Sequence, residues 1–294
     1  MTSESELAPA FVPRLSAREF DQIRRLAYDQ FGLELREGKE QLVSARLAKL
    51  MRALKLGSFQ QYYDYLLADR SGEALTAMID ALTTNHTSFF REPAHFDFLR
   101  STVLPQLQNR DQIAIWSAAC STGEEPYSIA FCLLQYLARR SSPSIRILAT
   151  DISTRVLAGA QRAAYPEERF AGFPVQELRP FLMRGTENWK GWYLVKKQVR
   201  DLIEFRRLNL MDTFSQVGLF PVIFCRNVMI YFDKVTQESL VNRLADHLEP
   251  GGYLLIGHAE SLNRINHPLQ YVQPAVYRKA GNGAGSSRAG RLPK

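Results

Sequence analysis

The sequence has few cysteines and no long apolar run, and each absence excludes a class of protein. Its 294 residues include 3 cysteines, Cys120, Cys132 and Cys225. An odd number of cysteines without a C-x-x-C spacing argues against a disulfide framework and a zinc ribbon, and it fits a reducing compartment. No apolar run approaches the ~20 residues that cross a bilayer. We therefore expect a cytoplasmic protein without direct insertion into a membrane.

Both ends of the chain also lack the features of a targeting signal or a folded segment. Residues 1–13 contain Glu4 and Glu6 and have no basic region followed by an apolar one, so they do not read as a secretory signal. We expect them to be a flexible N-terminus. Residues 281–294 are rich in Gly, Ser and Arg, a composition that predicts a disordered tail.

The composition is that of an ordinary globular protein. With 46% hydrophobic and 23% charged residues, the chain can bury a large core without metal or disulfide cross-links. A length of 294 residues predicts about two domains. The formal net charge of +7 favours an acidic partner, but charge alone does not separate nucleic acid, anionic lipid and acidic protein.

The chain has a purely helical pattern over residues 14–84. Ser16 and Glu19 have the spacing of a capping box, and Gly32 is placed to end the helix that follows. Apolar side chains recur at helical spacing in three sets, namely Phe20, Ile23, Ala27 and Phe31; Leu42, Val43, Leu47, Leu50, Met51 and Leu54; and Leu75, Met78, Ile79 and Leu82. The pattern predicts an all-helical domain, followed by a linker at residues 85–111.

From residue 112 to residue 280 the pattern is that of an α/β domain with a parallel sheet and crossover helices. The expected strands lie at residues 113–116, 145–150, 202–207, 222–225, 253–256 and 275–278. The expected helices lie at residues 126–140, 154–164 and 236–248. Residues 165–200 are too long for a simple connection. Their Pro, Gly and aromatic residues and the strand-like stretch 192–199 predict a small inserted β-subdomain.

The turn after the first expected strand, residues 117–126, lies where nucleotide-like ligands bind in open α/β sheets. It has one glycine where the dinucleotide fingerprint has three, so a phosphate site is poorly supported. Glu124 and Glu125 either suit a cationic or hydroxyl-bearing ligand or complement the helix dipole. Asp151, which ends the next strand, either binds ribose hydroxyls or begins the following helix. Together these acids would suit S-adenosylmethionine, a phosphate-free adenosine with a positive sulfonium.

Two further polar stretches could carry chemistry. Residues 83–92 place Arg91 beside two aromatic residues, where its planar guanidinium could orient a carboxylate. The alternative is a simple helix cap and linker. Arg226 and Asn227 directly follow a buried strand, at the edge of the sheet where ligands bind. Tyr231, four residues further on, either lies at the reacting centre or is a core aromatic.

Four stretches, LTTNHTSFFRE, WSAACSTGEEPYSIA, ATDIS and FCRNVMIYFDK, strongly resemble the CheR family of chemotaxis receptor glutamate O-methyltransferases. The similarity covers about residues 15–278. It implies an N-terminal all-helical domain followed by a class I, Rossmann-like methyltransferase domain with an inserted β-subdomain. It also implies S-adenosylmethionine as the cofactor, with S-adenosylhomocysteine as its product. The implied reaction forms methyl esters on glutamate side chains of methyl-accepting chemotaxis receptors, for sensory adaptation.

The resemblance also implies roles for individual residues. Arg91 and Tyr231 fall on the family's substrate-positioning residues. Glu124 lies next to the motif acid and ranks lower, and no metal site is implied. Since a glutamate carboxylate with a pKa near ~4.3 is ionised at neutral pH, methyl transfer to it needs no general base. Cofactor contacts are implied at Asn85, Thr87, Arg91, Glu125, Asp151, Asn209, Leu210, Arg226 and Asn227.

A basic ridge in the helical domain has two interpretations. Arg46, Lys49, Arg52 and Lys55 occur without an intervening acid, and the first three share one face of a helix. Such a ridge is often a solvated surface. The resemblance favours docking of the cytoplasmic domain of a chemotaxis receptor, whose methylation sites are acidic. A receptor C-terminal tail at the inserted β-subdomain is a further expected contact.

Two other functions remain open at this stage. The first is methylation of RNA or a small molecule, although the sequence has no RNP-type motif and we expect no nucleic-acid partner. The second is a non-catalytic module that binds S-adenosylmethionine for regulation. The presence of Arg91 and Tyr231 argues against that module.

Overall fold

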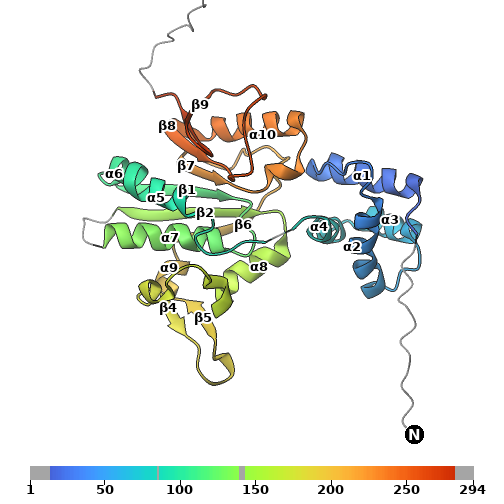
Figure 1. Cartoon of the computed structure of the whole chain (residues 1–294), viewed down its shortest axis with the longest axis horizontal. Coiled ribbons are helices and arrows are strands. Elements are labelled where there is room, and N and C mark those ends of the chain that lie inside the picture. Colours follow the sequence, from blue (N-terminus) through green and yellow to red (C-terminus); the bar gives the residue numbers. More distant parts are fainter. Residues whose placement is uncertain (1–13, 85, 139–142, 282–294) are drawn as a thin grey trace, which may run out of the picture. The chain divides into compact units, whose positions relative to one another are not determined.

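The computed structural model describes residues 14–84, 86–138 and 143–281. The chain divides into two compact units, and the boundary lies between Thr84 and Asn85 (Figure 1). The expectations for residues 1–13 and for the tail from residue 282 onward lie outside the described residues. Within the described residues, no helix is long and apolar enough to cross a membrane.

The first unit is helical throughout, as its sequence pattern predicts. Its first helix begins with the expected capping box, in which Ser16 and Glu19 each accept a hydrogen bond from the other's backbone amide, and it ends at Gly32 with a φ of 68°. The helices of the described part of this unit are α1 (Ala17–Phe31), α2 (Glu40–Ala53), α3 (Phe59–Ala68) and α4 (Glu73–Leu82).

The second helix, α2, buries a narrower stripe than its sequence suggests. Leu42 and Leu54 are 47% and 40% exposed, so their assignment to the apolar stripe was wrong. Val43, Leu47 and Met51 are buried and follow the i, i+4 spacing that keeps side chains on one face. One face of α2 therefore packs into the unit, and its other positions are available to charged side chains.

The second unit is built on a mostly parallel sheet, as predicted. The described strands of this sheet follow the order β6-β2-β1-β7-β8-β10-β9. The strands β6, β2, β1, β7 and β8 run parallel, and β10 is antiparallel to both of its neighbours. Only β9 was not expected from the sequence. The bounds are β1 (Gln112–Ala118), β2 (Ser144–Asp151), β6 (Ile203–Arg207), β7 (Phe220–Cys225), β8 (Leu248–Leu255), β9 (Leu269–Gln273) and β10 (Val276–Lys279).

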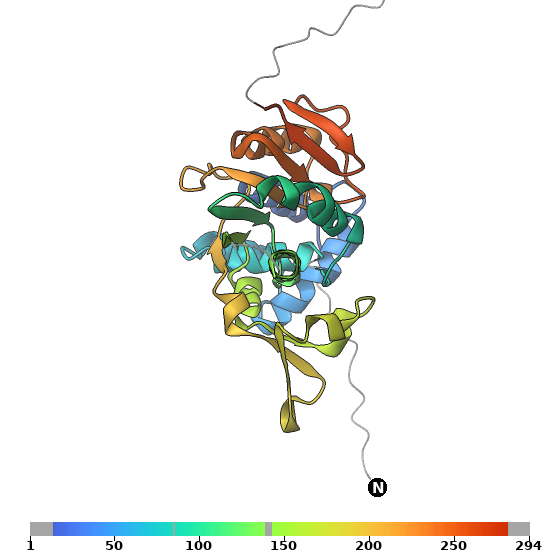
Figure 2. The ribbon, with the colours of Figure 1, turned by 90° about the vertical axis from the view of Figure 1, so that its left-hand side faces the viewer.

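Helices cover both faces of this sheet (Figure 2). Because side chains alternate along a strand, Ile115 joins the core on one face and Trp116 the core on the other. The first core includes residues of α5 and α7, and the second includes residues of α10. The helical segments of the main domain are α5 (Pro93–Phe98), the π-helix η1 (Leu99–Val103), α6 (Leu104–Leu107), α7 (Glu124–Leu137), α8 (Thr154–Arg162), η5 (Met229–Tyr231) and α10 (Lys234–Asp246).

A small antiparallel sheet is inserted between α8 and β6, yellow in Figures 1 and 2, as the long connection predicts. Its strands follow the order β3-β5-β4. The strand-like stretch that begins at Trp192 ends at Val195, because the next residues form a short helix. The elements of this insert are β3 (Ala164–Pro166), η2 (Glu167–Phe170), η3 (Val175–Leu178), β4 (Leu182–Arg184), η4 (Glu187–Trp189), β5 (Trp192–Val195) and α9 (Lys197–Arg200).

Candidate functional site

The carboxyl ends of four parallel strands meet at one edge of the main sheet. Ala118 of β1 pairs with Thr150 of β2 on one side and with Cys225 of β7 on the other. Asp151, at the end of β2, pairs with Arg207, at the end of β6. The residues that follow these strands are therefore neighbours at the edge where open α/β sheets bind ligands. Most of the cofactor contacts expected from the sequence lie on these connections.

The connection after β1 is a tight turn held by Asp151. One carboxylate oxygen of Asp151 accepts a hydrogen bond from the Ser121 amide at 2.8 Å, and the other accepts one from the Ser153 amide at 3.0 Å. Gly123 has a φ of 96°, and a Cβ there would lie 2.7 Å from the Cβ of Ala160. Only glycine fits this close approach. The turn thus places the start of α7 beside the end of β2.

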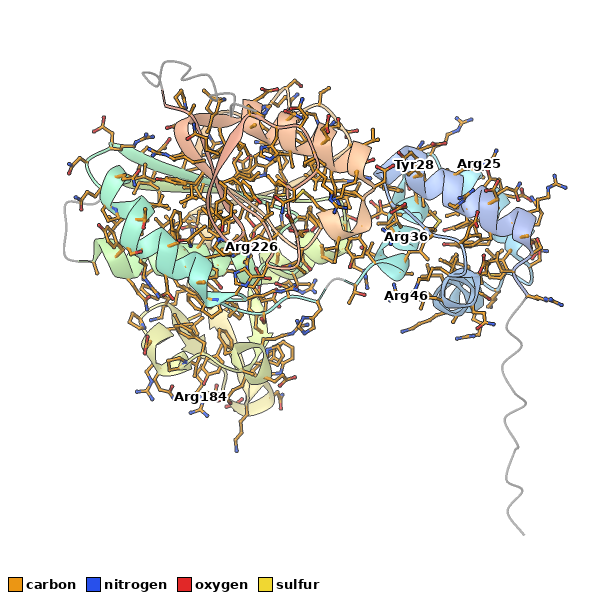
Figure 3. The ribbon with its side chains drawn as sticks, turned by 45° about the horizontal axis from the view of Figure 1, so that its top comes forward. Arg25, Tyr28, Arg36, Arg46, Arg184 and Arg226 are labelled. Carbon is orange, nitrogen blue, oxygen red and sulfur yellow. The ribbon has the colours of Figure 1, made fainter. Side chains whose placement is uncertain are left out.

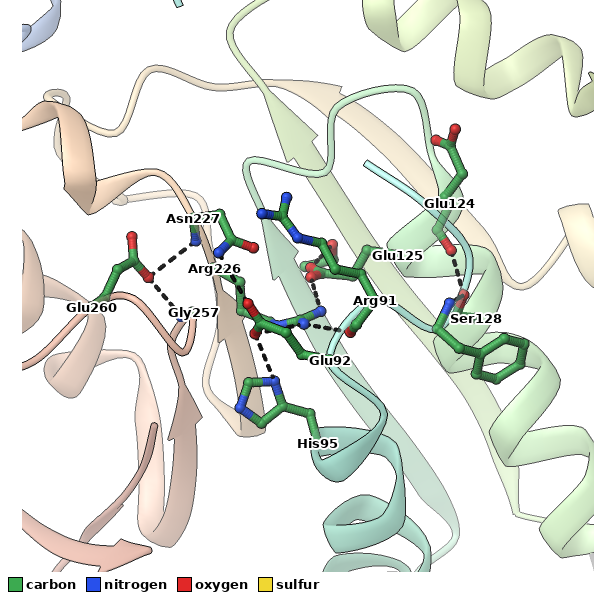
Figure 4. Close-up of polar contacts among 12 residues, drawn as sticks. Arg91, Glu92, His95, Glu124, Glu125, Ser128, Arg226, Asn227, Gly257 and Glu260 are labelled. Atoms are coloured by element: carbon green, nitrogen blue, oxygen red, sulfur yellow. Dashed lines mark hydrogen bonds and ion pairs between the residues drawn. The ribbon is translucent and has the colours of Figure 1, made fainter. Parts of the chain in front are cut away.

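Arg226, directly after β7, is the charged centre of the site. Its side chain is 2% exposed, and its guanidinium nitrogens lie 2.9 Å from a carboxylate oxygen of Glu92 and 2.9 Å from one of Glu125 (Figure 4). It also donates a hydrogen bond to the backbone carbonyl of Arg91. Burial raises the pKa of Glu92, but the charge and hydrogen bond of Arg226 outweigh this and lower that pKa to about 2. Glu92 is therefore ionised at neutral pH.

Asn227 links this centre to the loop after β8. Its side-chain amide donates to Glu92 at 3.2 Å, and its backbone amide donates to Glu260 at 3.0 Å. Glu260 also accepts a hydrogen bond from the amide of Gly257 at 2.6 Å. A Cβ at Gly257 would lie 2.4 Å from the side-chain nitrogen of Asn227, so the two loops require glycine at this position. Burial raises the pKa of Glu260 despite these amides.

The segment before α5 carries Arg91. The Phe90 amide donates to the hydroxyl of Ser128 in α7 at 2.9 Å, which fixes the backbone beside the site. The guanidinium of Arg91 is half-buried, donates to the carbonyl of His86 at 2.9 Å, and extends away from Glu92 (Figure 4). The backbone of Arg91 is thus held beside the buried network, whereas its guanidinium extends away from Glu92.

Arg169 of the insert reaches the same region. Arg169 donates to the carbonyl of Thr87 at 3.3 Å and to the carboxylate of Glu124 at 3.2 Å. Glu124 is fully buried and also accepts a hydrogen bond from Thr122 at 2.6 Å. Glu124 therefore ties the insert to the turn, while Glu125, the next residue, faces Arg226 and accepts from Ser117 at 2.7 Å.

Aromatic stacking reinforces this attachment of the insert. The rings of Phe89 and Phe170 stack with their centroids 4.2 Å apart, and those of Phe90 and Phe173 stack at 4.0 Å. Two consecutive residues before Arg91 are therefore clamped by two residues of the insert. We call Arg169, Phe170 and Phe173 the insert clamp.

The other residues expected at the site lie in varied surroundings. Thr87 is buried, and the Asn209 side chain accepts from the Met211 amide at 3.0 Å. Leu210 is 7% exposed and packs into the core on the α10 face of the sheet. Tyr231 is half-buried in η5. Asn85 lies outside the described residues.

The basic ridge is divided by the structure. Arg46, labelled in Figure 3, is half-buried and donates to the carbonyl of Leu82 and to the hydroxyl of Thr84, so it secures the end of α4. Lys49 and Arg52 are exposed on α2, and Lys55 is exposed just beyond its end. The exposed charges available to a partner are therefore those of Lys49, Arg52 and Lys55.

Sequence reasoning did not single out Glu92, Glu260 or Arg169. Glu92 lies in the same motif as Arg91, and only this place in the motif could have pointed to it. Glu260 and Arg169 lie in segments without a recognisable motif. Their roles depend on contacts between residues far apart in the chain, 33 positions for Glu260 and Asn227 and 45 for Arg169 and Glu124.

Comparisons with known proteins match both units. Residues 18–83 match the family model described as CheR methyltransferase, all-alpha domain, and residues 85–277 match CheR methyltransferase, SAM binding domain, where SAM is S-adenosylmethionine. Chemotaxis protein methyltransferase 2 of Pseudomonas aeruginosa is 43% identical over 89% of this chain and 93% of its own length. The chemotaxis protein methyltransferase of Borreliella burgdorferi is 40% identical over 89% and 94%. That of Escherichia coli is 36% identical over 90% and 91%.

Proposed function

Since the chain belongs to the CheR methyltransferase family and is an S-adenosylmethionine-dependent chemotaxis methyltransferase, we propose that it methylates glutamate side chains of chemotaxis receptors. The product is a glutamate methyl ester. The substrate is the cytoplasmic domain of a methyl-accepting receptor, and the enzyme acts in the cytoplasm. Three features support this proposal, namely the donor groups at the strand ends, the orientation of Arg91 and the exposed charges of α2.

The donor groups at the strand ends fit S-adenosylmethionine. The edge carries the carboxylates of Asp151, Glu125 and Glu92, together with the buried guanidinium of Arg226. Carboxylates suit ribose hydroxyls, an ammonium group and the vicinity of a sulfonium, and they would repel phosphates. We assign Asp151 to the ribose, and we assign Glu125, Arg226 and Asn227 to the amino-acid portion.

When bound, S-adenosylmethionine supplies an electrophilic methyl group. A new bond forms between a glutamate oxygen and the methyl carbon, while the carbon–sulfur bond breaks and its electron pair stays on sulfur. The substrate carboxylate is already ionised, so this chain holds it in line rather than removing a proton. Arg91 binds that carboxylate through its fork, and Tyr231 orients one of the reactants.

The observation that carries the proposal is the separation between Arg226 and Arg91. Arg226 is neutralised by two carboxylates and is buried, so it is unsuited to recruiting an acidic substrate. Arg91 is fixed through its carbonyl by Arg226, yet its guanidinium extends away from Glu92 and remains half-exposed. Two arginines that are neighbours in space thus have different roles: Arg226 serves the cofactor and Arg91 serves the substrate.

Two surfaces support receptor docking. Lys49, Arg52 and Lys55 are exposed on or beside α2 and suit an acidic receptor helix. In the insert, β4 lies at the edge of its sheet, and Met183 is 47% exposed on that strand. Arg184, labelled in Figure 3, is exposed on the same strand. An edge strand can pair with an extended peptide, so we place the receptor tail here.

The test is transfer of radiolabelled methyl groups to a purified receptor cytoplasmic fragment. We expect label that alkali releases as methanol, because carboxyl methyl esters hydrolyse readily whereas N-methyl groups do not. A fragment with alanine at its acceptor glutamates should remain unlabelled. The variant Arg91→Ala should lose most transfer but retain cofactor binding by calorimetry. Alkali-stable label, or label on RNA instead of receptor, would contradict the proposed substrate.

A further inference from the structure

His95 is a buried histidine whose ring is not hydrogen-bonded within the described part of the chain. It lies in α5 with 0% of the residue exposed, and neither of its ring nitrogens has a hydrogen-bond partner among the described residues. Its Nδ1 is 3.4 Å from a carboxylate oxygen of Glu92, the acid that pairs with Arg226 (Figure 4). Because buried polar atoms nearly always have a partner, a buried imidazole with neither nitrogen hydrogen-bonded to the protein points to an ion or a water as its partner.

A second imidazole completes a cluster at this point. The ligand atoms of Glu92, His95 and His258 all lie within 4.8 Å of one another. The rings of His95 and His258 are 4.8 Å apart at an angle of 69°, so they do not stack face to face. His258 is exposed on the loop after β8, so one member of the cluster is in contact with solvent.

The protonation states of the cluster suit a metal ion. Metal ligands must be deprotonated. Burial, with a further contribution from Arg226, lowers the pKa of His95 to about 3, so its imidazole is neutral at physiological pH. Glu92 is ionised there, as its lowered pKa requires. Two imidazoles and a carboxylate form a donor set that Zn²⁺ uses in proteins, with the fourth position open to water.

We propose that Glu92, His95 and His258 bind a divalent transition-metal ion of the Zn²⁺ type. Zinc ligands lie about 2.0–2.2 Å from the ion, so the cluster has to contract around it, and His258 is its exposed member. Glu92 keeps its contacts with Arg226 and Asn227, which orient the carboxylate as hydrogen-bonded neighbours do in other metal sites. Repulsion between the ion and Arg226 limits the affinity, and we expect binding in the micromolar range.

The site would couple metal binding to the cofactor. A bound ion competes with Arg226 for the negative charge of the Glu92 carboxylate. Arg226 in turn holds Glu125 and the backbone of Arg91. A bound ion therefore weakens cofactor binding, and by linkage the cofactor weakens metal binding by the same factor. This consequence rests on the proposed cofactor contacts, whereas metal binding itself does not.

The cysteines do not compete with this cluster for a metal ion, and a histidine outside the cluster serves as a control. Cys120, Cys132 and Cys225 are buried, and burial raises the pKa of each thiol, so none presents a thiolate. The chain has 5 histidines. His86 is exposed and lies outside the cluster, which makes it a matched control for His258.

The experiment is titration of the untagged full-length protein with Co²⁺ followed by visible absorption, and with Zn²⁺ in competition with a chromophoric chelator. We expect one equivalent to bind in the micromolar range, with an absorption band typical of a four-coordinate nitrogen and oxygen site. The variant His258→Gln should bind at least about tenfold more weakly. The variant His86→Gln should bind as the wild type does.

Two results would overturn the proposal. One is the absence of stoichiometric binding by the folded wild-type protein, which would leave a water as the partner of His95. The other is equal affinity in the His258→Gln and His86→Gln variants, which would place the ion elsewhere. Circular dichroism of each variant establishes that it is folded. Calorimetry with S-adenosylmethionine, with and without Zn²⁺, tests the coupling separately, so its failure would not be confused with failure of metal binding.

Discussion

Arg226 illustrates how one buried cation can organise a site. Its side chain is 2% exposed, and its two carboxylate partners, Glu92 and Glu125, are 15% and 12% exposed. Removing a buried charge from water costs several kcal/mol, and its partners repay that cost only while all of them are present. Replacing Arg226 alone would therefore leave two carboxylates buried without a counter-charge.

We expect Arg226→Met to lower the free energy of unfolding by about 3–5 kcal/mol, the usual cost of breaking a buried ion pair. Urea unfolding followed by circular dichroism measures this change. The control is Arg100→Met, which removes the exposed pair with Asp97, where the side chains are 40% and 66% exposed. That control should cost no more than about 1 kcal/mol. Equal losses in the two variants would show that Arg226 does not hold the site together.

His95 should make stability depend on pH. Its pKa is 6.5 when unperturbed and about 3 in the folded protein, because of burial and Arg226. As pH falls below 6.5, the unfolded chain binds a proton that the folded chain does not. The free energy of unfolding therefore decreases, with a slope of up to about 1.4 kcal/mol per pH unit, until pH approaches the folded pKa.

Urea unfolding at a series of pH values below neutrality tests this dependence. The variant His95→Gln should show a flatter profile than the wild type, and His86→Gln should follow the wild type. Glu92 and Glu260 also titrate differently in the folded state, with pKa values lowered and raised respectively, but they are present in all three proteins. Parallel profiles for the wild type and His95→Gln would contradict the assignment.

At this scale the sequence predicts polar residues that follow a strand better than it predicts their partners. Asp151 and Arg226 could be located because Asp151 ends a buried strand and Arg226 directly follows one, both at a predictable edge of the sheet. Their partners come from elsewhere in the chain, as when Glu92 meets Arg226 across 134 positions. No local pattern reports such a pairing. Arg46 shows the converse, since a residue expected on a docking ridge instead bonds to the end of α4.

Among the elements, α2 has a surface that can be tested apart from the site. We expect the double variant Lys49→Glu and Arg52→Glu to raise the apparent KM for receptor by about tenfold, since electrostatic attraction accelerates association by 10-fold or more. Calorimetry should show unchanged affinity for S-adenosylmethionine, because Arg46 and the core of the unit are preserved. Added salt should raise the wild-type KM, as screening shortens to ~8 Å near physiological ionic strength.

The control for α2 is Arg18→Glu, a reversal at an exposed position of α1 in the same unit. It should leave receptor kinetics nearly unchanged. If Arg18→Glu and the double variant raise KM equally, the effect is one of net charge and not of α2. If neither raises KM, Lys49 and Arg52 belong to a solvated face.

Two of the elements that the sequence missed, β9 and α3, share a physical cause. In β9, Tyr271 and Val272 are 64% and 40% exposed, so an edge strand presents no alternation of buried and exposed positions. In α3, Tyr62 is buried but Leu67 is 59% exposed, which blurs the helical stripe. The central strands were predicted because both of their faces are buried, and such strands appear as uninterrupted apolar runs.

On the scale of the whole second unit, the insert clamp joins two regions that the chain keeps apart. Arg169 reaches both the segment before Arg91 and the buried Glu124 at the start of α7. Phe170 and Phe173 stack on the same segment. A change in the insert is therefore transmitted directly to the backbone that carries the proposed substrate-binding residue.

We expect Arg169→Met to lower kcat for receptor methylation by about tenfold and to change cofactor affinity much less, since small displacements of a positioning group are costly in the transition state. The matched control is Arg179→Met, because Arg179 is an exposed arginine of the insert that does not touch Glu124 or Thr87. Steady-state kinetics and calorimetry provide the two readouts. Equal kcat values for the two variants would remove Arg169 from any positioning role.

The buried cysteines of the second unit give it a built-in reporter of transient opening. Cys120, Cys132 and Cys225 all lie in this unit, and the first unit has none. A small alkylating reagent can reach their thiols only while the packing around them is interrupted. The labelling rate at each cysteine therefore measures how often the packing around that cysteine opens. Mass spectrometry of the labelled peptides would map these openings from the strand ends to the core, in the native protein and without denaturant.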